Sequence, residues 1–176
     1  VGKWNVRGKE LIVHEDSTSP QAEFFRAIRT SLLFSFPDHP LRTILVTSPF
    51  SEEGKTIVAC NLAVALAQSG SRVLLVDADL RKPRIAQIFA QKDLPGLTHA
   101  LSTPINPAEL VFKTPIENLY ALFSGPLPPT PAELLGSQKM KNLVRRLSED
   151  FDYLVFDSPP FMAVTDSVVL GSFLDR

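Results

Sequence analysis

The stretch TSPFSEEGKTIVACNLA, residues 47–63, decides how this chain folds. Its centre, EGKT (53–56), has the glycine, lysine and hydroxyl residue that close a phosphate-binding loop. An apolar run of strand type (42–48) precedes it, and a helical pattern (55–68) follows. For the GKT triplet alone, an ordinary surface turn is an equally good interpretation. Its position between a strand and a helix favours a phosphate site, because helix N-terminal N–H groups attract anions.

The segments that follow extend this pattern into a layered sheet. We expect further strands at 72–78, 118–124 and 152–160, and helices at 20–36 and 132–149. Residues 80–114 are expected to form short helices and loops. The apolar runs do not alternate with polar residues, as is typical of parallel strands covered on both faces. The expected fold class is therefore α/β, a mostly parallel open sheet with helices on both faces.

Length and composition restrict the classes of protein to which this chain can belong. The 176 residues predict one main domain, residues 19–176, preceded by an extended polar arm, residues 1–18. The net charge of -1 gives no general electrostatic reason to bind nucleic acid. No apolar run approaches about 18 residues, so no segment is expected to span a membrane. A single cysteine, Cys60, excludes an internal disulfide and fits a reducing cytosol.

Acidic residues stand where two of the expected strands end. Asp77 and Asp79 follow the second strand, and Asp157 follows the fourth. Because the carboxyl ends of parallel strands lie along one edge of a sheet, these side chains should converge on the phosphate loop. Carboxylates suit Mg²⁺, and one beside a nucleotide can accept a proton from an attacking hydroxyl. For any one of the three, a turn-forming or capping role is a competing interpretation.

With these motifs in place, the chain resembles the bacterial protein-tyrosine kinases (BY-kinases). These are P-loop ATPases of the Mrp/MinD class that are linked to capsule and exopolysaccharide synthesis. The segments TSPFSEEGKT (47–56), VLLVDADLRKP (73–83) and YLVFDSPP (153–160) resemble their Walker A, Walker A′ and Walker B motifs. SPQAEFFRAIRTSL (19–32) is similar to the family's E-x-x-R-x-x-R ring-forming segment, and PPTPAELLGS (128–137) to a further family motif.

The resemblance implies roles for individual residues. ATP or ADP with Mg²⁺ would be the cofactors. The implied nucleotide-binding residues are Ser51, Glu52, Glu53, Gly54, Lys55, Thr56 and Ile57. The implied catalytic residues are Lys55, Asp77 and Asp79, with Asp77 as the base that activates a tyrosine hydroxyl. The implied Mg²⁺ ligands, direct or through water, are Thr56, Asp79 and Asp157. Arg81 and Lys82 fit either phosphate contacts or a solvated turn.

The resemblance also implies a function and partners. It indicates an ATP-dependent protein-tyrosine autokinase that regulates polysaccharide synthesis and export. Such a protein is expected in the cytoplasm at the inner face of the cell membrane, held by a membrane-embedded adaptor or a fused segment. Self-association into a ring would use Glu23, Arg26 and Arg29, which from the residues alone form a solvated helix face.

Two alternatives stay open. The chain fits a weak or inactive nucleotide-binding assembly module of the same complex, or a Mrp/MinD-type ATPase that hydrolyses ATP with water. Members of the ATPase class usually carry a lysine early in the phosphate loop, where this chain has Phe50.

The chain departs from the family pattern at three places. Glu52 stands where family loops have glycine, so a left-handed backbone there would cost about 1 kcal/mol or more. Because its carboxylate would also lie near the phosphates, weakened nucleotide binding is an expectation here. The chain stops at GSFLDR (171–176), where the family continues into another strand and the last helices, so the C-terminal part is expected to be truncated. The family's tyrosine-rich tail has no counterpart, since Tyr120 and Tyr153 both lie in expected strands.

Overall fold

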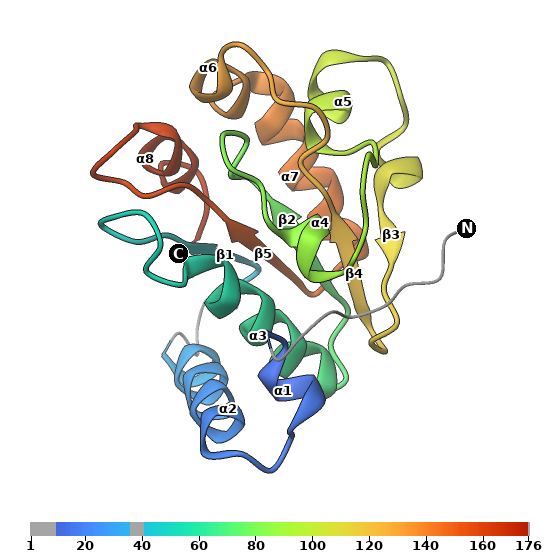
Figure 1. The fold of residues 1–176 in the computed structure, drawn as a ribbon. Helices are drawn as coiled ribbons and strands as arrows, with labels where there is room; N and C mark the ends of the chain where they lie inside the picture. Colours follow the sequence, from blue (N-terminus) through green and yellow to red (C-terminus); the bar gives the residue numbers. More distant parts are fainter. Residues whose placement is uncertain (1–9, 36–40, 176) are drawn as a thin grey trace.

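A five-stranded sheet forms the centre of the protein, which a computed structural model describes for residues 10–35 and 41–175 (Figure 1). The strands are β1 (Thr43–Val46), β2 (Val73–Asp77), β3 (Phe112–Lys113), β4 (Leu119–Leu122) and β5 (Tyr153–Asp157). Their order across the sheet is β1-β5-β2-β4-β3. The first four strands in this order run parallel, and β3 pairs antiparallel with β4. The predicted fold class is confirmed.

Helices cover both faces of this sheet (Figure 1). They are α1 (Ile12–Glu15), α2 (Pro20–Phe34), α3 (Lys55–Gln68), α4 (Ile85–Ile88), α5 (Leu97–Ser102), the 3₁₀ helix η1 (Pro107–Leu110), α6 (Pro131–Leu135), α7 (Gln138–Asp150) and α8 (Asp166–Gly171). One buried apolar cluster lies between helices α1, α2, α3 and α4 and one face of the sheet. A second cluster joins α5, α6, α7 and α8 with the other face.

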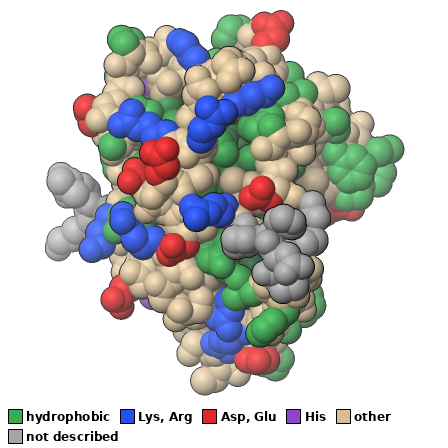
Figure 2. Space-filling model, turned by 180° about the vertical axis from the view of Figure 1, so that it is seen from behind, with side chains coloured by type: hydrophobic (Ala, Val, Ile, Leu, Met, Phe, Trp, Pro, Cys, Tyr) green, Lys and Arg blue, Asp and Glu red, His purple; other side chains and the backbone are tan. Residues whose placement is uncertain are grey.

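The central strands carry apolar side chains on both sides, and this fixes the layered arrangement. In β2, Val73 and Leu75 enter the first cluster, whereas Leu74 and Val76 enter the second. Side chains alternate between the faces of a strand, so an uninterrupted apolar run can be buried only between two helical layers. Surface charges stay outside these layers, and Figure 2 shows basic and acidic side chains mixed over one face of the molecule.

The prediction of an extended arm over residues 1–18 is wrong for its described part. Leu11 and Val13 are fully buried, and residues 12–15 form the helical turn α1. Buried Asn61 of α3 holds this segment, because its Oδ1 accepts the Val13 N–H at 3.0 Å and its Nδ2 donates to the Glu10 carbonyl at 2.7 Å. The apolar triplet 11–13 within a polar stretch is the signal that the prediction overlooked. Residues 1–9 lie outside the described part.

Two further expectations are corrected. The helix expected at 132–149 is divided into α6 and α7, because Ser137 adopts an extended backbone and its hydroxyl accepts the Met140 N–H at 3.2 Å, starting a new helix. The region 80–114 contains the two-residue strand β3 in addition to the expected helices. The helix expected from residue 20 is confirmed as α2, but its predicted end near residue 36 lies outside the described residues.

Within residues 10–35 and 41–175, no helix combines the length and the apolar character that crossing a membrane requires.

Candidate functional site

The backbone between β1 and α3 forms the loop that the sequence predicted. Gly54 adopts a left-handed conformation (φ 86°) at the N-cap position of α3. Glycine occupies this region without the steric cost that a Cβ brings. The first N–H groups of a helix have no partner within the helix, and α3 has no acidic residue in its first turn. The start of α3 therefore favours an anion.

Glu52 shares this unusual backbone. Its φ is 67°, so the position where the resemblance expects glycine does require a left-handed residue. The strain is about 1 kcal/mol for a residue with a Cβ. The neighbouring Glu53 braces the loop, because its Oε2 accepts the Phe50 N–H at 2.9 Å. The loop thus has a fixed shape that includes one strained residue.

Lys55 and Asp79 form the central ion pair of the site. Lys55 Nζ lies 2.9 Å from Asp79 Oδ2, and the two side chains are only 11% and 3% exposed. The other oxygen, Asp79 Oδ1, accepts the backbone N–H groups of Arg81 (3.3 Å) and Lys82 (2.9 Å). Asp79 therefore joins the phosphate loop to the turn that follows β2.

Asp77 and Asp157 lie opposite each other at the ends of β2 and β5, and both are fully buried. Asp77 Oδ2 accepts the Ile85 N–H at 3.1 Å, but Asp77 Oδ1 has no hydrogen-bond partner among the described residues. Neither oxygen of Asp157 has a hydrogen bond of standard geometry there either. Buried polar atoms without partners are rare in native proteins. These carboxylates therefore mark a place where further polar groups are expected to bind.

Burial also changes the acidity of this pair. It raises the pKa of Asp157 to about 6, although the nearby Thr56 hydroxyl and Lys55 ammonium act in the opposite direction. Burial, with a second contribution from the Asp157 charge, raises the pKa of Asp77 well above its ordinary value. Two adjacent buried carboxyls resist holding two negative charges. The pair is suited to accept a proton or a cation.

A cleft of about 450 Å³ opens above these residues. Its lining consists of Ser51, Glu52, Gly54, Lys55, Thr56, Ile57, Asp79, Arg81, Lys82, Arg84, Pro159, Pro160, Ala163 and Val164. The structure thus brings the predicted nucleotide-binding residues to one cleft, except Glu53, which braces the loop. Asp77 and Asp157 do not line the cleft, because they lie fully buried at the strand ends.

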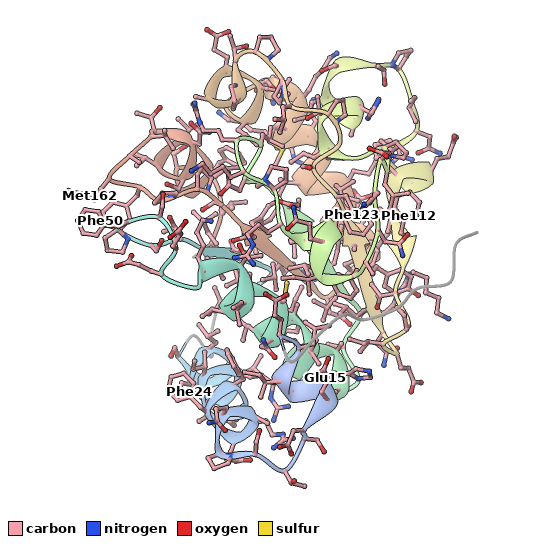
Figure 3. All side chains as sticks on the ribbon, in the orientation of Figure 1. Glu15, Phe24, Phe50, Phe112, Phe123 and Met162 are labelled. Carbon is pink, nitrogen blue, oxygen red and sulfur yellow. The ribbon has the colours of Figure 1, made fainter. Side chains whose placement is uncertain are left out.

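Sequence reasoning missed the far wall of the cleft. The wall comes from the loop after β5, which runs beside the phosphate loop and is joined to it by the Phe161 N–H and the Ser48 carbonyl, 3.0 Å apart. Figure 3 shows Phe50 and Met162, one from each loop, pointing away from the sheet. Arg84 was also missed, although the run RKPR (81–84) directly after a strand was a readable signal.

The residues of the ring-forming motif lie elsewhere, on α2. Arg26 pairs with Glu23 at 3.0 Å and also donates to the Ser17 carbonyl. Arg29 Nη1 donates to the Ala65 carbonyl at 3.0 Å, which joins α2 to α3. Arg29 therefore has an intramolecular role that the sequence did not reveal.

Among the described residues, side chains alone do not complete a metal site. The described residues contain no group of three or more His, Cys, Asp or Glu arranged to hold a metal ion. The two Asp157 oxygens without hydrogen-bond partners and the buried Thr56 hydroxyl nevertheless form a set of hard oxygen donors. Such a set suits Mg²⁺ that keeps several waters and takes its remaining ligands from a substrate phosphate.

Comparison with known proteins identifies a family model and relatives that this chain resembles in sequence. A family model described as an AAA domain matches residues 43–172. The tyrosine-protein kinase YwqD of Bacillus subtilis (strain 168) is 39% identical over 167 residues, which cover 95% of this chain and 70% of YwqD. The tyrosine-protein kinase ptk of Acinetobacter johnsonii is 34% identical over 163 residues, covering 93% of this chain but 22% of that longer protein.

Solved structures of similar fold include a chimerical protein and a MinD protein. The chimerical protein CapA2B2 superposes with a TM-score of 0.90 at 39% identity, covering 95% of this chain and 74% of that chain. The septum site-determining protein MinD of Pyrococcus horikoshii OT3, complexed with Mg-ADP, has a TM-score of 0.61 at 26% identity and covers 73% of this chain and 54% of that chain.

The buried charge of Asp157 predicts a measurable pH dependence of stability. The pKa of this carboxyl is raised from its ordinary value of 3.8 to about 6, so between these values the folded protein keeps a proton that the unfolded chain releases. The free energy of unfolding therefore falls as the pH rises through this window. We expect Asp157→Asn to raise it by about 1–3 kcal/mol at pH 7.5 and to flatten the fall.

Urea denaturation at several pH values measures this effect. Glu149→Gln is the control, because Glu149 is an exposed carboxylate on α7 and its loss should change stability by less than about 0.5 kcal/mol. A less stable Asp157→Asn protein at pH 7.5 would contradict the assignment of Asp157 as a destabilising buried charge.

Proposed function

Because this chain belongs to the bacterial tyrosine-protein kinase family, we propose that it transfers the terminal phosphate of ATP to tyrosine hydroxyl groups. The observation that carries the proposal is the convergence of Lys55, Asp77, Asp79 and Asp157 at one edge of the sheet, beside a cleft lined by the phosphate loop. Family membership also implies nucleotide binding, which the start of α3 supports.

The nucleotide phosphates would lie against the loop 51–57. Gly54 lets the backbone approach closely, and the first N–H groups of α3 would donate to phosphate oxygens. Lys55 is held by Asp79 at 2.9 Å, so a bound phosphate would share or replace this partner. A buried ammonium near the β- and γ-phosphates stabilises the charge that develops during transfer.

Mg²⁺ fits the carboxylates that lack hydrogen bonds. Thr56 and Asp157 would hold the ion directly or through water, and Asp79 would join them once Lys55 turns toward phosphate. When bound, Mg²⁺ neutralises phosphate charge and favours in-line transfer. Binding a cation would also relieve the electrostatic cost of placing Asp157 beside Asp77.

Asp77 is the proposed base. Burial and the neighbouring Asp157 raise its pKa, which makes the ionised form a better proton acceptor. The tyrosine O–H proton would pass to Asp77, the tyrosine oxygen would bond to the γ-phosphorus, and ADP would leave as the bond to the β-phosphate oxygen breaks. A bound cation would favour the ionised form of Asp77 that this step requires.

Partners and location belong to the same proposal. The resemblance of the motifs to BY-kinases supports a role in polysaccharide synthesis and export, with the protein at the cytoplasmic face of the membrane through an adaptor. The exposed side of α2, with the Glu23–Arg26 pair, is the proposed ring contact. Arginine suits such a contact because its planar group binds carboxylates with defined geometry.

Replacement of Asp77 tests the proposed base. Asp77→Asn should lower the rate of phosphotyrosine formation by about 10²–10⁴-fold, because the tyrosine hydroxyl loses its proton acceptor. Phosphotyrosine blotting after incubation with ATP, Mg²⁺ and a tyrosine-containing copolymer measures the rate. Asp152→Asn, at the opposite edge of the sheet, is the matched control and should keep the wild-type rate. Phosphate release without phosphotyrosine would reject the kinase proposal in favour of ATP hydrolysis.

Two substitutions separate the effects of charge and of backbone strain at Glu52. Glu52→Gln and Glu52→Gly should both raise the affinity for Mg²⁺–ADP about threefold to tenfold, because each removes a negative charge near the phosphates. Only Glu52→Gly should also raise the free energy of unfolding, by about 1 kcal/mol, because it removes the left-handed strain. Calorimetric titration and urea denaturation measure the two effects. Absence of binding heat in both the wild type and Glu52→Gly would reject the nucleotide site.

Replacing both Arg26 and Arg29 by alanine should reduce the mass in solution to that of a single chain, because the proposed contact loses its cations. Multi-angle light scattering measures the mass, and thermal unfolding checks that losing the Arg29–Ala65 hydrogen bond leaves the fold intact. Arg145→Ala on the exposed side of α7 is the control. An unchanged mass of the double variant would exclude this surface as the contact.

A further inference from the structure

Arg81 and Asp166 form an ion pair between two distant parts of the chain. Arg81 Nε lies 2.9 Å from Asp166 Oδ2, and Arg81 Nη2 lies 3.0 Å from Asp166 Oδ1. Both carboxylate oxygens therefore bind one guanidinium, in the two-pronged geometry that arginine favours. The side chain of Asp166 is 0% exposed, whereas that of Arg81 is 42% exposed. The pair has a buried anchor and an accessible cation.

This pair joins the two walls of the cleft. Arg81 belongs to the wall that follows β2, together with Asp79, Lys82 and Arg84. Asp166 begins α8. The loop before it supplies the opposite wall through Pro159, Pro160, Ala163 and Val164. The ion pair consequently fixes the separation of two segments that lie 85 residues apart in the sequence.

Arg81 is also fixed through its backbone. Its N–H donates to Asp79 Oδ1, while Asp79 Oδ2 holds Lys55. Asp79 thus connects Lys55 and Arg81, two of the four cationic residues that line the cleft. Asp166 raises the pKa of Arg81 further, so the guanidinium keeps its charge at every working pH.

The guanidinium keeps unused donors. Arginine has five N–H groups, and the contacts to Asp166 use one at Nε and one at Nη2. Among the described residues, Nη1 makes no recorded hydrogen bond, and Arg81 lines the cleft. An arginine held in this way presents its remaining donors without the entropy loss of ordering a free side chain.

We propose that Asp166 is a positioning residue that holds Arg81 at the cleft so that its free N–H groups bind the nucleotide polyphosphate. This inference rests on the proposed nucleotide site and adds a second cation to Lys55. A purely structural role explains the pair less well. Buried ion pairs contribute little net stability compared with apolar contacts, whereas an accessible guanidinium beside a phosphate loop has a direct use.

A double-mutant cycle with Mg²⁺–ADP tests the inference by calorimetric titration. Arg81→Ala should lower the affinity about tenfold to a hundredfold, because a hydrogen bond to a charged group is lost. Asp166→Asn should lower it about fivefold, since the guanidinium is no longer held by a charged partner. In the Arg81→Ala background, Asp166→Asn should cost less than about twofold more, because Asp166 acts through Arg81.

Two further variants sharpen the test. Arg81→Lys keeps the charge but lacks the fork that binds both Asp166 oxygens, so it should restore less than half of the lost binding free energy. Asp150→Asn, an exposed acidic residue at the end of α7, is the matched control and should leave the affinity unchanged. Thermal unfolding of each variant shows whether the fold persists, and if Asp166→Asn does not fold, the two Arg81 variants decide.

The possible results distinguish a failure of this inference from a failure of the proposed nucleotide site. Wild-type affinity in Arg81→Ala or Asp166→Asn overturns the inference and leaves the nucleotide site standing. Independent, additive losses would make Asp166 a structural residue of α8 and would also overturn it. If the wild type itself binds no Mg²⁺–ADP, both the inference and the nucleotide site fall.

Discussion

The insertion of β5 between β1 and β2 is the constraint on which the site depends. The strand order β1-β5-β2 brings Asp157, more than a hundred residues after the phosphate loop, next to Asp77 and close to Thr56. All three strands run in the same direction, so their carboxyl ends share one edge of the sheet. The same insertion positions the loop after β5 as the far wall of the cleft. A different strand order would separate Asp77, Asp157 and Lys55.

This arrangement has an energetic cost, which the packing of the surrounding core offsets. Asp77 and Asp157 are buried without full hydrogen bonding, and Glu52 adopts a strained backbone. The two apolar layers on either side of β2 and β5 fix the positions of these residues. Local defects of this kind concentrate at functional sites, where the structure around them determines their geometry. The buried carboxylates and the strained Glu52 thus lie at the edge of the sheet that carries the proposed site.

Charge balance links the elements of the cleft. Asp79 holds Lys55 of the phosphate loop and the turn that carries Arg81, and Arg81 reaches across to Asp166 on α8. Three structural segments are therefore joined by two ion pairs and a backbone hydrogen bond. Nucleotide phosphates would enter a frame in which Lys55 and Arg81 already have carboxylate partners. Such a frame keeps the cations in place and limits repulsion between them before a substrate arrives.

The sequence by itself determined the local elements and the chemistry of the loop. The apolar runs of β1, β2, β4 and β5, the helix after Gly54 and the acidic strand ends were all readable, because strand and helix patterns depend on near neighbours. It also indicated the left-handed position of Glu52 through its resemblance to a glycine-containing loop. The fold class followed, since uninterrupted apolar strands require helices on both faces.

Only the tertiary structure decided the rest. The burial of Leu11 and Val13 depends on Asn61, and the break between α6 and α7 depends on a cap at Ser137 that outweighs the helical pattern around it. The pairing of Arg81 with Asp166, like the bond from Arg29 to Ala65, joins residues that no local pattern connects. Side-chain partners across such distances are chosen by the packing of the whole domain, because many segments of similar composition compete for each contact until the fold excludes them.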